Sequence, residues 1–79
     1  MPGKRLGEKI REDRKAQGWT LKELASKVNI SLTTLQRIET GAISPAVDLL
    51  VRIASKLQQP VISYLADKKS TFSQRFQSD

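Results

Sequence analysis

Four side chains in the segment Asn29 to Gly41, "NISLTTLQRIETG", have types and a spacing that suit molecular recognition rather than bond-breaking chemistry. Arginine carries a planar fork of hydrogen-bond donors, a glutamine amide donates and accepts, threonine offers a hydroxyl and a methyl group, and leucine makes apolar contacts. At about 100° per residue, all four lie on the side of a helix opposite Leu35 and Ile38. An ordinary solvated helix face does not carry this combination, so the segment predicts a contact surface. The four residues are Leu32, Thr33, Gln36 and Arg37.

The residue types that most catalytic sites need are absent from the sequence or do not converge in it. The chain contains no histidine and no cysteine, no glycine-rich phosphate loop, and no pair of carboxylates brought together from separate elements. Glu8, Glu12 and Asp13 share one expected helix with several basic neighbours, an arrangement typical of a solvated face. We therefore expect no enzymatic activity, no metal site and no cofactor.

Length and charge favour one small domain with a polyanionic partner. The chain has 79 residues and no disulfide, which is near the lower limit for a single hydrophobic core. Its net charge of +6 attracts polyanions, most commonly nucleic acid, although a surface kept soluble by charge would have the same composition. No apolar run approaches the roughly 20 residues of a membrane span, and no signal peptide is evident. We expect a cytoplasmic protein without a membrane partner.

Caps and stops in the first half of the chain predict short helices joined by tight turns. A first helix spans roughly residues 4–17 and ends at Gly18, which can adopt the left-handed conformation. Thr20 and Glu23 are spaced as the capping box of a second helix. Asn29 tolerates a positive φ and can end that helix.

Residues typical of helix starts and helix ends recur in the second half of the chain. Ser31 is the expected N-cap of a third helix, and Gly41 is its stop. Ser44 is the expected cap of a fourth helix with Pro45 at the first helical position, where the missing N–H costs nothing. A short fifth helix runs from Pro60 to Leu65.

These elements predict an all-α fold, a compact five-helix bundle over residues 1–66, with a polar and flexible tail or linker over residues 67–79. Only Asn29 and Ile30 separate the second helix from the cap of the third, so the two helices must cross steeply. The small side chain of Ala25 suits the contact between them. The pattern is that of a helix-turn-helix, and an ordinary αα-hairpin in a small bundle would show the same features.

The stretch "LKELASKVNISLTTLQRIETG" resembles the DNA-binding motif of the phage-repressor/Cro (Xre-type) helix-turn-helix family, and the similarity extends over about residues 4–66. The matching positions are Leu24 with Ala25, the turn entered through Val28, the spaced Leu35 and Ile38, and the ending Ile38-Glu39-x-Gly41. The resemblance implies a lambda-repressor-like DNA-binding domain in a bacterial or phage-type cytoplasm.

Two positions depart from the family pattern. Leu21 stands at the start of the second helix, where the family usually has a polar residue that meets the DNA backbone. Asn29 stands at the turn position that is commonly glycine, and asparagine tolerates the conformation needed there. Leu21 leaves Thr20, Lys22 and the helix N-terminus to make that backbone contact.

The resemblance implies that the third helix enters the major groove of DNA. Arg37 can then offer its fork to guanine, while Leu32 and Thr33 can pack on thymine methyl groups and Gln36 can bond a base edge. Gln36 and Thr40 suit a plain surface equally well. The implied base-contacting residues are Leu32, Thr33, Gln36 and Arg37, and the implied backbone-contacting residues are Thr20, Lys22, Ser31, Thr34 and Thr40.

Arg14 continues the apolar spacing of Leu6 and Ile10 and so points toward the edge of the core. A partly buried arginine needs a partner, and the resemblance suggests a structural ion pair with Glu39. The alternative is that the Arg14 side chain extends along the surface to water.

The resemblance also implies the partners. Relatives act mostly as two-fold dimers on near-palindromic operators in double-stranded DNA. The similarity favours repression, although activators use the same surface. The fifth helix and the tail can form the dimer contact, or their apolar residues can simply close the core; these residues are Val61, Ile62, Tyr64 and Leu65. Two other functions stay open, namely the DNA-reading N-terminal part of a larger ligand-sensing regulator, and a protein-binding antitoxin or adaptor of the same fold.

Overall fold

The computed structural model describes residues 2–68, with side chains from residue 5 to residue 66. This part of the chain is all-helical and contains no strand, as the sequence predicts. The helices are α1 (Pro2–Ala16), α2 (Leu21–Lys27), α3 (Leu32–Thr40), α4 (Val47–Leu57) and α5 (Val61–Lys68). None of these helices is both long enough and apolar enough to cross a lipid bilayer.

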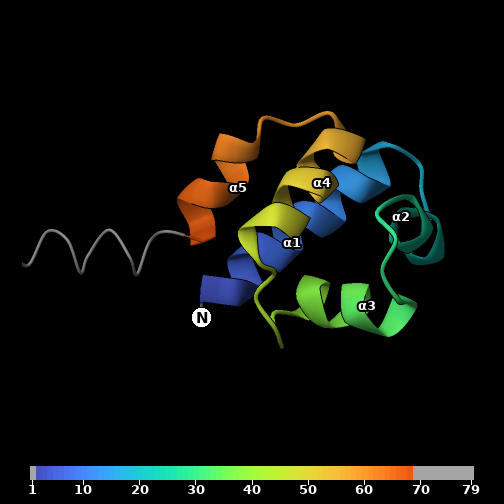
Figure 1. Cartoon of the computed structure of the whole chain (residues 1–79), viewed down its shortest axis with the longest axis horizontal. Coiled ribbons are helices and arrows are strands. Elements are labelled where there is room, and N and C mark those ends of the chain that lie inside the picture. The colour runs from blue at the N-terminus through green and yellow to red at the C-terminus, as the bar shows by residue number, and fades with distance from the viewer. Residues whose placement is uncertain (1, 69–79) are drawn as a thin grey trace, which may run out of the picture.

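Helix α1 is the element on which the others assemble. It packs against α3, α4 and α5, while α2 packs mainly against α3, and α4 against α5. In Figure 1, α5 lies at one end of the molecule and α2 at the other, with α1 between them. The buried apolar side chains form one core that all five helices share: Leu6, Ile10, Leu24, Ala25, Val28, Leu35, Ile38, Leu50, Ile53, Ala54, Leu57 and Tyr64.

The predicted helix ends around the turn between α2 and α3 are confirmed. Thr20 and Glu23 form both hydrogen bonds of the capping box, and the Ser31 hydroxyl accepts the N–H of Thr34 at the start of α3. Asn29 has a φ of 61°, and Gly41 ends α3 with a φ of 86°. These features depend on residues close in sequence, which is why the pattern predicts them.

The predicted start of the fourth helix is wrong by two residues. Ser44 is not its N-cap and Pro45 is not its first residue, because α4 begins at Val47 with Ala46 as an extended N-cap that makes no side-chain capping bond. Pro45 is buried instead, in the connection that precedes the helix.

The fifth helix is longer than predicted, running to Lys68 rather than stopping at Leu65. Helix α5 therefore includes the first two residues of the segment 67–79 that we predicted as a tail. Residues 69–79 lie outside the described part of the chain.

Helix α5 is anchored to α1 by polar contacts. The fully buried Tyr64 donates its hydroxyl to the Asp13 carboxylate, and Lys9 Nζ donates to the Ser63 carbonyl over 3.3 Å. Burial, and then the hydrogen bond to Asp13, raise the pKa of Tyr64 far above its ordinary value, so the phenol remains a donor. The expected placement of Asp13 on a solvated face is thus wrong, because this half-buried carboxylate satisfies a buried hydroxyl.

Gly7 lets α1 approach the end of α3 at the level of the backbone. A Cβ atom added to this buried residue would overlap the carbonyl oxygens of Ile38 and Glu39 and would lie 2.7 Å from the carbonyl carbon of Glu39. Those neighbours are backbone atoms that cannot rotate away. The crossing of α1 over α3 therefore requires glycine at this position.

Replacing this glycine should destabilise the domain. For Gly7→Ala, we expect a loss of unfolding free energy of about 1–3 kcal/mol or more, because the methyl group forces the two helices apart. Thermal melting followed by circular dichroism measures the change. Gly18→Ala is the control, since a Cβ there meets nothing within 4 Å and only the positive φ of 78° is disfavoured. A smaller loss for Gly7→Ala than for Gly18→Ala would contradict the close approach.

Candidate nucleic-acid interface

The turn between α2 and α3 holds these two helices in a fixed relation. The N–H of Ile30 donates to the carbonyl of Ala25 over 3.0 Å, so the chain reverses direction directly after α2. Ala25 is 3% exposed at the crossing, where a small side chain permits close contact. Leu24 of α2 and Val28, the C-cap of that helix, are also buried, while Ile30 is partly buried against the core.

The side of α3 that faces away from the core carries the four residues expected to contact bases. Leu35 and Ile38 are buried on the inner side. Leu32 is 46% exposed, and Thr33, Gln36 and Arg37 are exposed as well. The structure therefore brings these four together on one accessible face, with an apolar side chain beside hydrogen-bonding ones.

The hydroxyl groups on α3 differ in whether their hydrogen is available to a ligand. Ser31 donates its hydroxyl to Thr34 Oγ1 over 2.8 Å and accepts the Thr34 N–H over 3.0 Å. Thr40 donates to the carbonyl of Arg37 over 3.2 Å. A phosphate oxygen only accepts hydrogen bonds, so Thr34 keeps its hydroxyl hydrogen available for such a contact, unlike Ser31 and Thr40.

The start of α2 also presents a hydroxyl donor and a cation. Thr20 Oγ1 accepts the N–H of Glu23 over 3.1 Å, which leaves its hydrogen free to donate. The Glu23 carboxylate accepts the N–H of Thr20 over 2.7 Å, and this bond is the largest cause of the lowered pKa of Glu23. The capping bond is therefore present at neutral pH and is lost as the pH falls through that lowered pKa. Lys22, the second residue of α2, is exposed.

Arg14 and Glu39 form a two-point ion pair between α1 and α3. Arg14 Nε lies 2.8 Å from Glu39 Oε2, and Arg14 Nη2 lies 3.0 Å from Glu39 Oε1. The residues are 8% and 7% exposed. The structure thus joins the two side chains that the family resemblance paired, rather than directing the arginine to water.

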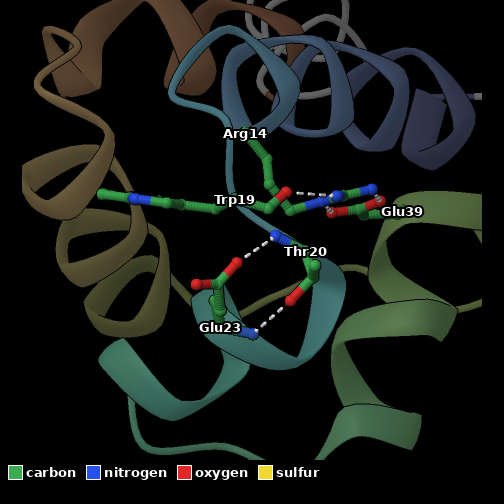
Figure 2. A network of polar contacts seen from close by, with 5 residues as sticks. All are labelled: Arg14, Trp19, Thr20, Glu23 and Glu39. Atoms are coloured by element: carbon green, nitrogen blue, oxygen red, sulfur yellow. Dashed lines mark hydrogen bonds and ion pairs between the residues drawn. The ribbon is translucent and has the colours of Figure 1, made fainter.

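The same guanidinium also holds the connection between α1 and α2. Arg14 Nη1 donates to the carbonyl of Trp19 over 2.9 Å, immediately before the Thr20 cap (Figure 2). The Trp19 ring is held as well, because Lys27 Nζ lies 4.6 Å from its centre, in cation–π contact. One buried side chain of α1 therefore orients both helices of the helix-turn-helix.

A groove of about 460 Å³ lies beside this ion pair, between α1, the start of α2 and the second half of α3. It runs along the flank of α3 that faces α1. Its lining residues are Glu8, Arg11, Arg14, Leu21, Gln36, Glu39 and Thr40. Sequence reasoning did not single out Arg11, although its position one helical turn before Arg14 is the signal that places both on the same side of α1.

Comparison with known proteins identifies helix-turn-helix proteins and transcriptional regulators as relatives. A helix-turn-helix family model matches residues 10–61. The transcriptional regulator ClgR of Mycobacterium tuberculosis, from strains CDC 1551 and H37Rv, is 37% identical over 62 residues, which cover 78% of this chain and 55% of that regulator. This chain thus matches only about half the length of those relatives.

Solved structures share the fold. A crystal structure of the clp gene regulator ClgR from Corynebacterium glutamicum has a TM-score of 0.77 and 27% identity, covering 90% of this chain and 92% of that one. A second crystal structure of that regulator has a TM-score of 0.79 and 24% identity, covering 99% and 83%, and supports the fold alone.

Removing the acidic partner of the buried ion pair should destabilise the domain strongly. Glu39→Ala leaves the Arg14 guanidinium buried without its counter-charge, and we expect a loss of about 3–5 kcal/mol of unfolding free energy. Thermal melting measures this loss, which should persist in 1 M salt because salt screens a buried pair only weakly (the Debye length is about 3 Å there). Glu12→Ala, an exposed change on α1, is the control. An unchanged melting temperature for Glu39→Ala would show that the pair does not join the helices.

Proposed function

Because the chain belongs to the helix-turn-helix family whose model spans residues 10–61, we propose that it binds double-stranded DNA in a sequence-specific manner and regulates transcription. The observation that carries this proposal is the outer face of α3. Its hydrogen-bonding and apolar side chains are exposed, while the inner side of the helix is buried in the core. The relatives named as transcriptional regulators support the same function. A regulator of this kind acts in the cytoplasm, where bacterial DNA lies.

In this proposal, α3 inserts into the major groove and its outer face reads base edges. Arg37 offers two parallel donors to guanine O6 and N7, which is the commonest specific contact in such complexes. Leu32 and the methyl group of Thr33 pack against thymine methyl groups. The Gln36 amide bonds an adenine or another base edge.

Contacts to phosphates fix the position of α3 without reading sequence. The free hydroxyl hydrogens of Thr20 and Thr34 support these two as donors, and Lys22 adds a positive charge beside the start of α2. Ser31 and Thr40 can contribute once their hydroxyl hydrogens turn away from their internal acceptors.

Two-fold dimerisation on a near-palindromic operator would give a single short recognition helix sufficient affinity. Helix α5 is the proposed dimer contact, and the segment after it, which the sequence also suggests, lies outside the described residues. Ile62 is 63% exposed, whereas Tyr64 is buried in the core and is unavailable to a partner. Val61 and Leu65 are half-buried beside it. Repression, by occupying a promoter, is the proposed direction of regulation.

A second form of this function is an alternative proposal. The domain can serve as the DNA-reading part of a larger, ligand-sensing regulator; this chain matches 55% of ClgR from M. tuberculosis. In that case the same surface of α3 binds DNA, and dimerisation is shared with other segments.

Selection of bound sequences from a random duplex library tests the proposal. A dimeric regulator is expected to enrich a near-palindrome with half-sites about 10 base pairs apart or a multiple of that spacing. A separated DNA reader would enrich a single half-site. Absence of any enrichment would contradict DNA reading and favour a protein-binding antitoxin or adaptor of the same fold.

Replacing Arg37 should lower sequence preference, while replacing Lys22 should not. We expect Arg37→Ala to weaken binding to the selected duplex by about 1–3 kcal/mol and to relax the preference at one base pair. Lys22→Ala should weaken binding to the selected and the random duplex alike, because a phosphate contact carries no sequence information. Fluorescence anisotropy with both duplexes measures the difference. Equal losses on both duplexes for Arg37→Ala would exclude its role in base reading.

A charge at the exposed apolar position of α5 should disrupt the dimer. For Ile62→Asp, we expect dimer dissociation to become easier by about tenfold or more, since an unpaired carboxylate is buried at the contact. Sedimentation velocity across a concentration series measures this shift. Val51→Asp, also an exposed apolar position but on α4, is the matched control. If Val51→Asp dissociates the dimer and Ile62→Asp does not, the contact is on α4 instead.

A further inference from the structure

We propose that the groove between α1 and α3 binds a phosphate of the DNA backbone and that Arg11 is the residue that holds it. This inference rests on the proposed DNA binding and adds a contact from α1, outside the helix-turn-helix itself. The groove has a volume of about 460 Å³ and is lined by Arg11 on one wall and by Gln36 and Thr40 of α3 on the other.

The dimensions of DNA bring a phosphate to this place. The major groove is about 12 Å wide, and an α-helix with its side chains is about 10–12 Å in diameter. A helix lying in the groove therefore has a phosphate backbone close to each flank. One flank of α3 faces α1, and the groove lies along that flank, beside Gln36 and Thr40.

Most of the other groups that line the groove have no donor to offer a phosphate. All three guanidinium nitrogens of the buried Arg14 are bound, two by Glu39 and one by the Trp19 carbonyl. Thr40 donates its hydroxyl to the Arg37 carbonyl. Leu21, at the first position of α2, contributes an apolar wall.

Arg11 is the cation of the groove that remains available. It is exposed, and within residues 5–66 it takes part in none of the side-chain hydrogen bonds or ion pairs. Its planar fork matches two phosphate oxygens. Gln36 lies on the opposite wall, and because its amide is assigned to a base edge, Arg11 is the donor left for the phosphate.

Glu8 is the group that opposes a phosphate in this groove. The charge of Glu39 is compensated by its ion pair with Arg14, whereas Glu8 is exposed on the same wall as Arg11. Its repulsion of the phosphate predicts that removing this charge strengthens DNA binding. This effect gives the proposal a second readout of opposite sign.

The first test compares Arg11→Ala with Arg52→Ala, an identical change at an exposed position of α4. Anisotropy is measured with the full chain on a duplex recovered by selection and on a random duplex over a range of salt concentrations. We expect Arg11→Ala to weaken binding to both duplexes by a similar factor, about 3- to 10-fold. The negative slope of log K against log salt should become less steep by about one unit. Its melting temperature should not change, since the side chain is exposed.

The second test compares Glu8→Gln with Glu12→Gln, an exposed carboxylate of α1 that does not line this groove. We expect Glu8→Gln to bind both duplexes more tightly than wild type and more tightly than Glu12→Gln. An equal gain for the two variants would reflect net charge alone and would count against the groove.

These outcomes separate the inference from the function on which it rests. If wild type binds no duplex, DNA binding itself is wrong and the groove has no phosphate to hold. If wild type binds but Arg11→Ala behaves like Arg52→Ala, the DNA proposal stands and the assignment of Arg11 is overturned. A loss for Arg11→Ala on the selected duplex alone would make Arg11 a base reader and would likewise overturn the phosphate contact.

Discussion

The buried ion pair between Arg14 and Glu39 is the interaction on which the rest of the structure depends. Both charges lie inside a small domain, where either alone would be strongly unfavourable. The arginine satisfies Glu39 with two nitrogens and the Trp19 carbonyl with the third (Figure 2). Because these groups belong to α1, α3 and the connection into α2, the pair can form only when all three elements are in their native places. Gly7 adds to the same constraint by letting the α1 and α3 backbones approach.

This arrangement explains how a helix of nine residues can present a recognition surface. An isolated helix of that length is not stable in water, so α3 depends on its packing against α1 and α2. Once Leu35, Ile38 and Glu39 are buried on its inner side, every other side is free to carry side chains chosen for contact rather than for folding. The exposed Leu32, which adds nothing to the core, is consistent with that division. The proposed contacts of Arg37 and Arg11 lie on this outer face and on its flank.

The local features of the fold were predictable because they depend on neighbouring residues. The capping box at Thr20, the cap at Ser31 and the left-handed Asn29 and Gly41 are each defined within about four residues. The same local reasoning failed at Pro45, whose ring is buried before α4 begins. It also failed at Asp13, which the charge pattern assigns to a solvated helix face but which accepts the hydroxyl of Tyr64, 51 residues away.

The sequence by itself determined the number and order of the helices, the short turn between α2 and α3, and the face of α3 that carries Leu32, Thr33, Gln36 and Arg37. Periodicity and capping act over one or two helical turns, so residues close together in the chain are enough to predict them. Only the tertiary structure decided that Gly7 lies against backbone carbonyls of α3 and that Arg11 shares a groove with Gln36. These are contacts between elements, and they depend on how the helices cross. Residue spacing along the chain does not encode that geometry.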